Sequence, residues 1–198
     1  MNRFYTVEKP LLRWGDYHYI LVHGMSCHLV RVDGRIQLER TGPFVPPISF
    51  PGISDLVVTN AFRRELENSR LIGLHYQPII KKLIVKSDWH KWDQTAEEPP
   101  RYPADGEPEN YILGKSHSKD ISEQVGDLWE LALNGSAWVQ REKEVCGRND
   151  IHLLAETWNG EDLFRARGVG YIYATSRAKE WFERNASEWV TFQEAFTK

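Results

Sequence analysis

Leu56-Val57-Val58-Thr59-Asn60 opens the stretch of sequence that decides the fold, residues 56–76. Ile172-Tyr173-Ala174-Thr175-Ser176 opens a second stretch, residues 172–192, which repeats the pattern of the first without a gap at a constant offset of 116 residues. Each copy contains a β-rich lead-in, a capping residue, a short helix and an alternating strand. The repeat predicts an α+β fold with mixed and antiparallel sheets, built from two pseudo-repeated β-α-β halves.

The sequence around these copies predicts further strands and one more helix. Asp33-Gly34 lies between alternating flanks and predicts a hairpin over 29–38 with a type I′ turn. The strand predicted over 73–86 contains Pro78, which lacks a ladder donor, so we expect the strand either to bend there or to begin its regular pairing only after residue 78. Apolar spacing predicts a helix over 120–133. The other predicted strands are 4–7, 17–22, 55–58, 151–155, 162–165, 169–174 and 189–193, with helices at 60–68 and 176–185.

The chain between the two copies has a different composition. Residues 88–130 hold eleven Asp and Glu against four Lys and Arg, and they include several Trp and Tyr residues. Four prolines between residues 99 and 108 disfavour regular structure there, which predicts a long surface loop. We therefore expect one domain over 1–198, with pseudo-repeat halves at about 1–87 and 134–198 and an acidic aromatic insertion at about 88–133.

Composition limits the class of protein. A chain of 198 residues can bury a core without disulfides, and a net charge of −3 gives no reason to expect nucleic-acid binding. Cys27 and Cys146 are far apart in sequence, which favours a reduced cytosol. Because the chain has no apolar run of 18 residues and no signal-like beginning, we expect a cytoplasmic protein without membrane association.

Motifs for catalysis or metal binding are weak. The seven histidines form no HExxH motif and no helical pair, and neither cysteine has a CxxC partner, so no metal and no cofactor are expected. Gly168-Val169-Gly170 lacks the context of a dinucleotide loop and predicts a turn. Asp88, His90 and Asp93 form the one group with an acid-base spacing, which leaves a small cytoplasmic enzyme as an alternative.

Three parts of the chain carry a family resemblance. They are Arg3 to Glu8, Asp55 to Thr59 with the helix that follows, and a C-terminal run of Asp162-Leu163-Phe164-Arg165, Ile172 to Ala178 and Trp189 to Phe192. These residues resemble bacterial immunity proteins of polymorphic and contact-dependent toxin systems. One related group is the double-CxxCG immunity family. The other is a broader group whose C-termini share a run of DxFR, then VSxxxxxxLE, then VxF.

The cysteines depart from the first of these groups. Cys27 stands in Gly24-Met25-Ser26-Cys27-His28 and Cys146 in Val145-Cys146-Gly147, so each CxxCG motif would have lost half of its ligands. Our hypothesis is that the two cysteines are remnants of a zinc site, and no metal is carried over from the family.

The resemblance implies a non-catalytic protein that binds and neutralises a cognate toxin, the C-terminal domain of a secreted effector. Tight interfaces of this kind combine aromatic anchors with complementary charge, which is the composition of the acidic aromatic insertion. A regulatory interaction domain without a toxin is a further alternative, and either a monomer or a dimer is compatible with the sequence. The predicted partner-binding residues are Trp89, Trp92, Asp93, Glu97, Glu98, Tyr102, Asp105, Glu107 and Glu109.

Overall fold

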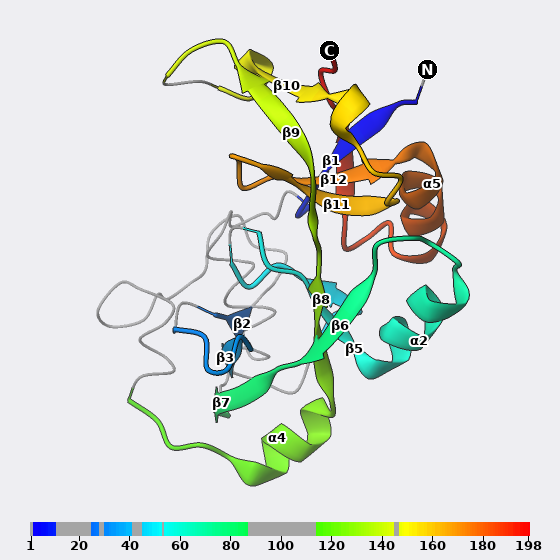
Figure 1. The fold of residues 1–198 in the computed structure, drawn as a ribbon. Coiled ribbons are helices and arrows are strands. Elements are labelled where there is room, and N and C mark those ends of the chain that lie inside the picture. Colours follow the sequence, from blue (N-terminus) through cyan, green and yellow to red (C-terminus); the bar gives the residue numbers. More distant parts are fainter. Residues whose placement is uncertain are drawn as a thin grey trace, which may run out of the picture. The chain divides into compact units, whose positions relative to one another are not determined.

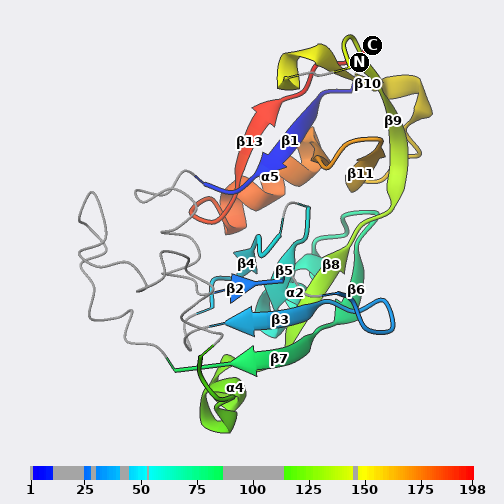
Figure 2. The same ribbon diagram turned by 90° about the vertical axis from the view of Figure 1, so that its left-hand side faces the viewer.

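The computed structural model of the chain describes residues 2–10, 25–27, 30–40, 45–52, 54–86, 114–144 and 147–198. The chain divides into two compact units (Figures 1 and 2). The first unit comprises residues 1–10, 63–75 and 131–198, and the second comprises residues 11–62 and 76–130. Each unit is described below by itself.

The first unit is built on a six-stranded sheet with the order β10-β9-β11-β12-β1-β13. The pairs in this sheet are antiparallel except for β9 and β11, which are parallel. The first strand of the chain therefore lies between two of the last ones, which places residues 1–10 with the C-terminal part. The strands are β1 (Phe4–Glu8), β9 (Gly135–Arg141), β10 (Ile151–Leu154), β11 (Leu163–Arg167), β12 (Ile172–Thr175) and β13 (Thr191–Glu194).

The C-terminal tail joins the two edges of this sheet. After β13, which lies beside β1 in Figure 2, the chain continues to a bridge between Thr197 and Leu153 of β10. The Leu153 amide donates to the Phe196 carbonyl (2.8 Å), and the Lys198 amide donates to the Leu153 carbonyl (2.9 Å). The Ala155 amide adds a third bond to the Lys198 carbonyl (3.0 Å). The sheet thus closes on itself, which satisfies backbone groups that an open edge would expose.

Closure turns one face of the sheet into an interior. The core cluster on this face consists of Phe4, Ala137, Leu153, Phe164, Ala166 and Tyr173. The rings of Phe164 and Tyr173 stack with centroids 5.8 Å apart. Trp158, which follows the short 3-10 helix η4 (Ala155–Thr157), meets Phe4 edge to face at 5.1 Å. Aromatic residues, rather than aliphatic ones, therefore fill much of this core.

The opposite face of the sheet carries α5 (Ser176–Asn185). Thr175 caps this helix, because its Oγ1 accepts a hydrogen bond from the Ala178 amide (3.3 Å). Ala178 and Phe182 are buried four residues apart on one helical face, and the Phe182 ring lies 6.3 Å from that of Phe192. Burying Phe182 alone contributes about 1.5–3 kcal/mol.

The second unit holds two smaller sheets. One has the order β2-β3-β7, and the other has the order β4-β5-β8-β6. In the second sheet, Leu131 and Ala132 of β8 and His75 of β6 are assigned to the first unit, as is most of α2. The core of the second unit consists of Ile36, Leu38, Val57, Ile84, Ile121, Val125 and Leu128. The elements are β2 (Met25–Ser26), β3 (Gln37–Arg40), β4 (Ile48–Ser49), β5 (Val57–Thr59), α2 (Asn60–Asn68), β6 (His75–Pro78), β7 (Ile80–Ile84), α4 (Lys119–Val125) and β8 (Leu128–Ala132).

The α+β class and the mixed and antiparallel sheets are confirmed. Both copies also contain the predicted strand, helix and strand in order, as β5-α2-β6 and β12-α5-β13. Thr59 caps α2 as Thr175 caps α5, since the Phe62 amide donates to Thr59 Oγ1 (3.2 Å). The equivalence of the two halves as a structural repeat is not confirmed, and the single domain with halves at 1–87 and 134–198 stays a prediction.

Two local predictions need correction. The helix predicted over 120–133 ends at Val125, because Gly126 adopts a positive φ of 68°, and the following residues pair with β5 as β8. The predicted hairpin over 29–38 is limited to its turn, with φ of 49° at Asp33 and 76° at Gly34 and a single bridge between Val32 and Arg35. Residues 37–40 instead pair as β3 with β2 and β7, so non-local pairing outweighs the hairpin.

Other local predictions are confirmed. The strand predicted over 73–86 is interrupted after Pro78 and continues as β7, and the chain turns at Gly168, whose φ is 90°. The strand predicted over 17–22 lies outside the described residues. None of the described helices is long and apolar enough to cross a membrane.

Candidate functional site

The residues predicted to bind a partner all lie outside the described part of the chain. The same is true of the alternative catalytic group, Asp88, His90 and Asp93, and of Cys146. Their arrangement therefore stays a prediction. The described residues nevertheless bring together four groups of polar and aromatic side chains, of which one surrounds Asp162.

Asp162 holds three parts of the first unit together. Its side chain is 7% exposed, and its Oδ1 accepts a hydrogen bond from the Thr175 hydroxyl (2.8 Å). Its Oδ2 accepts from the Ile72 amide (2.9 Å) and from Arg177 Nη1 (3.0 Å). Three donors on one carboxylate compensate for its burial. Asp162, the first residue of the DxFR run, therefore fixes the segment around Ile72 and the beginning of α5 to the start of β11.

Arg177 has a second anchor. Its Nη2 donates to the Arg70 carbonyl (2.6 Å), while its side chain remains 52% exposed. The guanidinium is thus held in one orientation by two bonds, although half of it faces solvent. Fixing a long side chain in advance reduces the entropy that is lost when it binds a ligand.

An open recess of about 450 Å³ lies beside this network. Its charged residues are Asp162, Arg177 and Arg3, and the Arg3 side chain is 72% exposed. The volume falls in the range of small-ligand sites, about 300–1,000 Å³. The recess is lined by Asn2, Arg3, Trp158, Asp162, Thr175, Ser176 and Arg177.

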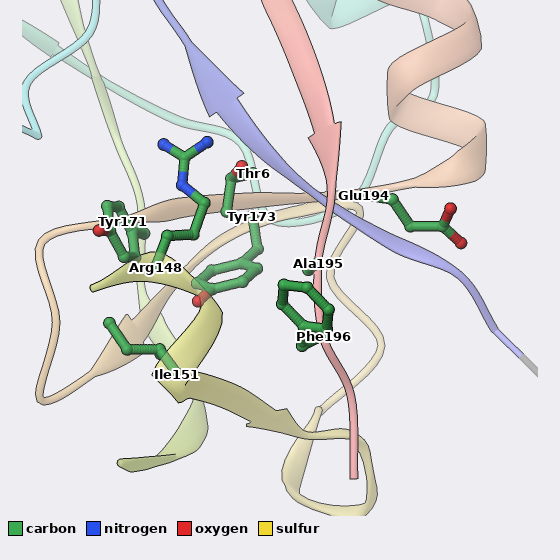
Figure 3. A pocket seen from close by; sticks show the side chains of 8 residues that line it. All are labelled: Thr6, Arg148, Ile151, Tyr171, Tyr173, Glu194, Ala195 and Phe196. Atoms are coloured by element: carbon green, nitrogen blue, oxygen red, sulfur yellow. The ribbon is translucent and has the colours of Figure 1, made fainter. Parts of the chain in front are cut away.

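A smaller recess lies against Tyr171 and Tyr173 (Figure 3). Arg148 stands between the two tyrosines in this view, with its guanidinium carbon 5.5 Å from the Tyr171 ring centroid. It also forms an ion pair with Glu8 and a hydrogen bond with Gln193. The volume of about 10 Å³ has room for no more than a single water molecule.

Burial raises the pKa of the Tyr173 hydroxyl to about 12, and Tyr171 contributes in the same direction. Arg148 opposes this shift. The Tyr173 phenol therefore stays neutral at physiological pH, which suits a core residue better than a general base.

Trp138 is the most exposed tryptophan among the described residues, at 51%. The guanidinium carbon of Arg167 lies 5.1 Å from the Trp138 ring centroid, and Arg167 Nε donates to the Gly135 carbonyl (2.9 Å). The Trp138 amide donates to Thr157 Oγ1 (2.8 Å). An exposed Trp stacked with a fixed Arg has the composition of an interface anchor.

Arg31 forms the main charge cluster of the second unit. Its Nη1 and Nη2 donate to the two carboxylate oxygens of Glu130 at 2.7 and 2.8 Å, and Nη2 also donates to Asp55 (2.8 Å). The Glu130 side chain is 4% exposed, so the pair compensates a buried charge. The carboxylates raise the pKa of Arg31 further above its already high value, with the Glu130 hydrogen bonds as the largest cause.

Cys27 belongs to the same cluster. Its thiol donates to Asp55 Oδ2 (3.4 Å), and burial, followed by Asp55, raises the pKa of the thiol to about 12. A thiol of this kind is a poor nucleophile and a poor metal ligand at neutral pH. The described residues contain no group of three His, Cys, Asp or Glu side chains arranged to hold a metal ion.

No protein-family model matches the chain, and the search of curated proteins found no match.

None of these four groups was predicted from the sequence, although single members such as Asp162 and Cys27 belong to patterns described above. Arg177 and Arg3 were not singled out, because nothing in the local sequence shows that they meet Asp162 or a recess. Trp138 was not singled out either, because no strand was predicted over residues 135–141 and its apolar neighbours Ala137 and Val139 give no sign that its ring is exposed.

Proposed function

We propose that this chain is an immunity protein, a non-catalytic protein that binds and neutralises a cognate bacterial toxin domain in the cytoplasm. The observation that carries the proposal is the role of the residues behind the family resemblance. Asp162 fixes the beginning of α5, Phe164 fills the core, and Phe182 packs against Phe192. These residues support the fold of the first unit, so the resemblance to immunity proteins involves residues with structural roles.

The composition of residues 88–130 supports a binding role. The segment combines an excess of acidic residues with tryptophans and tyrosines, and aromatic residues are enriched at the centres of interfaces. Acidic residues around such anchors accelerate the capture of a basic partner. We propose that Trp89 and Trp92 are the anchors, and that the carboxylates near them face basic residues of the toxin.

The Trp138–Arg167 pair is a second proposed contact. The Trp138 residue is half exposed, and the Arg167 guanidinium is already hydrogen-bonded to the carbonyl of Gly135. A fixed pair of this kind loses little side-chain entropy on binding. Truncation of a central anchor typically weakens binding by about 2 kcal/mol or more, which is roughly thirtyfold in affinity.

Co-expression with the toxin tests the proposal. The candidate toxin is the C-terminal domain of a secreted effector encoded beside this chain. We expect cells that produce the toxin domain to survive only when this chain is present. Equal killing with and without the chain, at verified expression, would refute the immunity function.

Three variants locate the interface in the same assay. We expect Trp89→Ala combined with Trp92→Ala to abolish rescue, and Trp138→Ala to weaken it. Phe196→Ala is the matched control, because Phe196 is an aromatic residue with a comparable exposure of 46%. If the control fails as completely as the tryptophan variants, the loss reflects folding and the assigned interface is wrong.

A further inference from the structure

We propose that the recess beside Asp162 binds a carboxylate group through Arg3 and Arg177. The source of the carboxylate is either a small free acid or an acidic side chain of a partner. The site is separate from the predicted toxin-binding residues, and the inference holds whether or not the immunity function is correct.

The charges of the recess favour a monoanion. Asp162 is buried at 7% exposure and already accepts three hydrogen bonds, so its charge is compensated within the fold. Among the residues that line the recess, Arg3 and Arg177 contribute two positive charges and Asp162 one negative charge, which leaves +1. Glu194, which is mostly exposed and lies 4.0 Å from Arg3, is outside this lining. One carboxylate neutralises this charge, whereas a phosphate monoester at about −1.5 to −2 would exceed it and leave the recess with a net negative charge.

The geometry of Arg177 suits a planar anion. Two N–H groups hold the guanidinium to Asp162 and to the Arg70 carbonyl, and 52% of the side chain faces solvent. A guanidinium has five N–H donors in a rigid plane, so donors remain for an incoming carboxylate. Because Arg177 is fixed before binding, the carboxylate meets an orientation that is already formed.

Arg3 supplies the second charge in a more adaptable form. Its Nε lies 4.0 Å from Glu194 Oε1, and both side chains are mostly exposed, so this pair is weak. A carboxylate in the recess would draw Arg3 away from Glu194 at little cost. Asn2 and Ser176 add neutral hydrogen-bonding groups to the lining, and Trp158 adds an apolar wall.

Titration of the full-length chain with propionate, a small acid that carries a single negative charge at neutral pH, tests the proposal. Amide chemical shifts of Ser176 and Arg177 are followed by NMR, with sodium chloride at matched ionic strength as the reference. We expect saturable shifts at these amides. A peptide with one internal Glu and blocked ends, titrated in parallel, distinguishes a partner's side chain from a free acid, and inorganic phosphate is expected to bind more weakly.

Two variants and one control decide the outcome. Arg177→Gln and Arg3→Gln are each expected to weaken binding at least tenfold, and Arg3 is exposed enough for its variant to leave the fold intact. Arg184→Gln is the matched control, because Arg184 lies on the same helix, its Nε donates to the Glu180 carbonyl one turn earlier, and it does not line the recess. The proposal is overturned if neither carboxylate probe saturates, if phosphate binds more tightly, or if Arg3→Gln binds as the unchanged protein does.

Discussion

Replacing Asp162 by alanine tests whether the hydrogen bonds of its carboxylate stabilise the first unit. The Asp162 carboxylate accepts from the Thr175 hydroxyl, the Ile72 amide and Arg177. Its removal leaves the buried Thr175 hydroxyl and the part-buried Ile72 amide without this acceptor. A hydrogen bond to a charged group contributes about 1.5–3 kcal/mol. The half-exposed Arg177 adds no more than about 1 kcal/mol. Since the variant also removes a buried charge, we expect a net destabilisation of about 3 kcal/mol.

Urea unfolding measures this change through the transition midpoint and the slope m. Because the chain has two compact units, amide hydrogen exchange in β12 is needed to assign the loss to the first unit. Arg177→Gln is the comparison variant, with an expected loss of about 1 kcal/mol or less. Ordinary surface substitutions destabilise a protein by less than about 0.5 kcal/mol. A destabilisation this small for Asp162→Ala would refute the stabilising role of the Asp162 hydrogen bonds.

Three further predictions concern other parts of the structure. Arg31→Met leaves the buried Glu130 carboxylate unpaired and is expected to destabilise the second unit by about 3 kcal/mol in urea unfolding. In a Cys146→Ser background, Cys27 is expected to react with a disulfide reagent at pH 8 at least about tenfold more slowly than an unperturbed thiol. Raising its pKa from 9.0 to about 12 lowers the thiolate fraction roughly a thousandfold, and the greater nucleophilicity of a more basic thiolate offsets only part of this loss. Deletion of residues 195–198 removes the backbone bonds that close the sheet and is expected to cost about 2–4 kcal/mol, with faster exchange of the β10 amides.

Each of these predictions has its own control. The double variant Arg31→Met with Glu130→Leu removes both charges and is expected to recover most of the stability, so a failure to recover would contradict the unpaired-charge explanation. Thr197→Ala retains the backbone bonds of the tail and should leave stability nearly unchanged. Equal losses for this variant and the deletion would show that closure contributes nothing.

The Cys27 prediction extends to stability. The folded thiol has a higher pKa than the unfolded one, so the stabilisation from the neutral thiol is fully present below pH 9 and is lost as the pH rises from 9 to about 12. Asp55→Asn removes the second-largest cause of the shift and is expected to increase the rate of labelling at pH 8. An unchanged rate would contradict the contribution of Asp55.

The local parts of the fold could be predicted because they depend on neighbours in sequence. The apolar residues Phe62 and Leu66, four apart after Thr59, predict α2 and its cap, and Ala178 and Phe182 after Thr175 predict α5. The helix over 120–133 was wrong in its second half, because its apolar residues fit either period and pairing with β5 selects the strand.

The sequence alone determined the α+β class, the order of strand, helix and strand in both copies, and the turns at Asp33-Gly34 and Gly168, since each follows from contacts within about ten residues. Only the tertiary structure decided that β1 lies between β12 and β13, that the tail at Thr197 closes the sheet on Leu153, and that Asp162 meets groups 90 residues away. These contacts join distant segments, and their partners are selected by burial and by the satisfaction of backbone and charged groups, which no local pattern encodes.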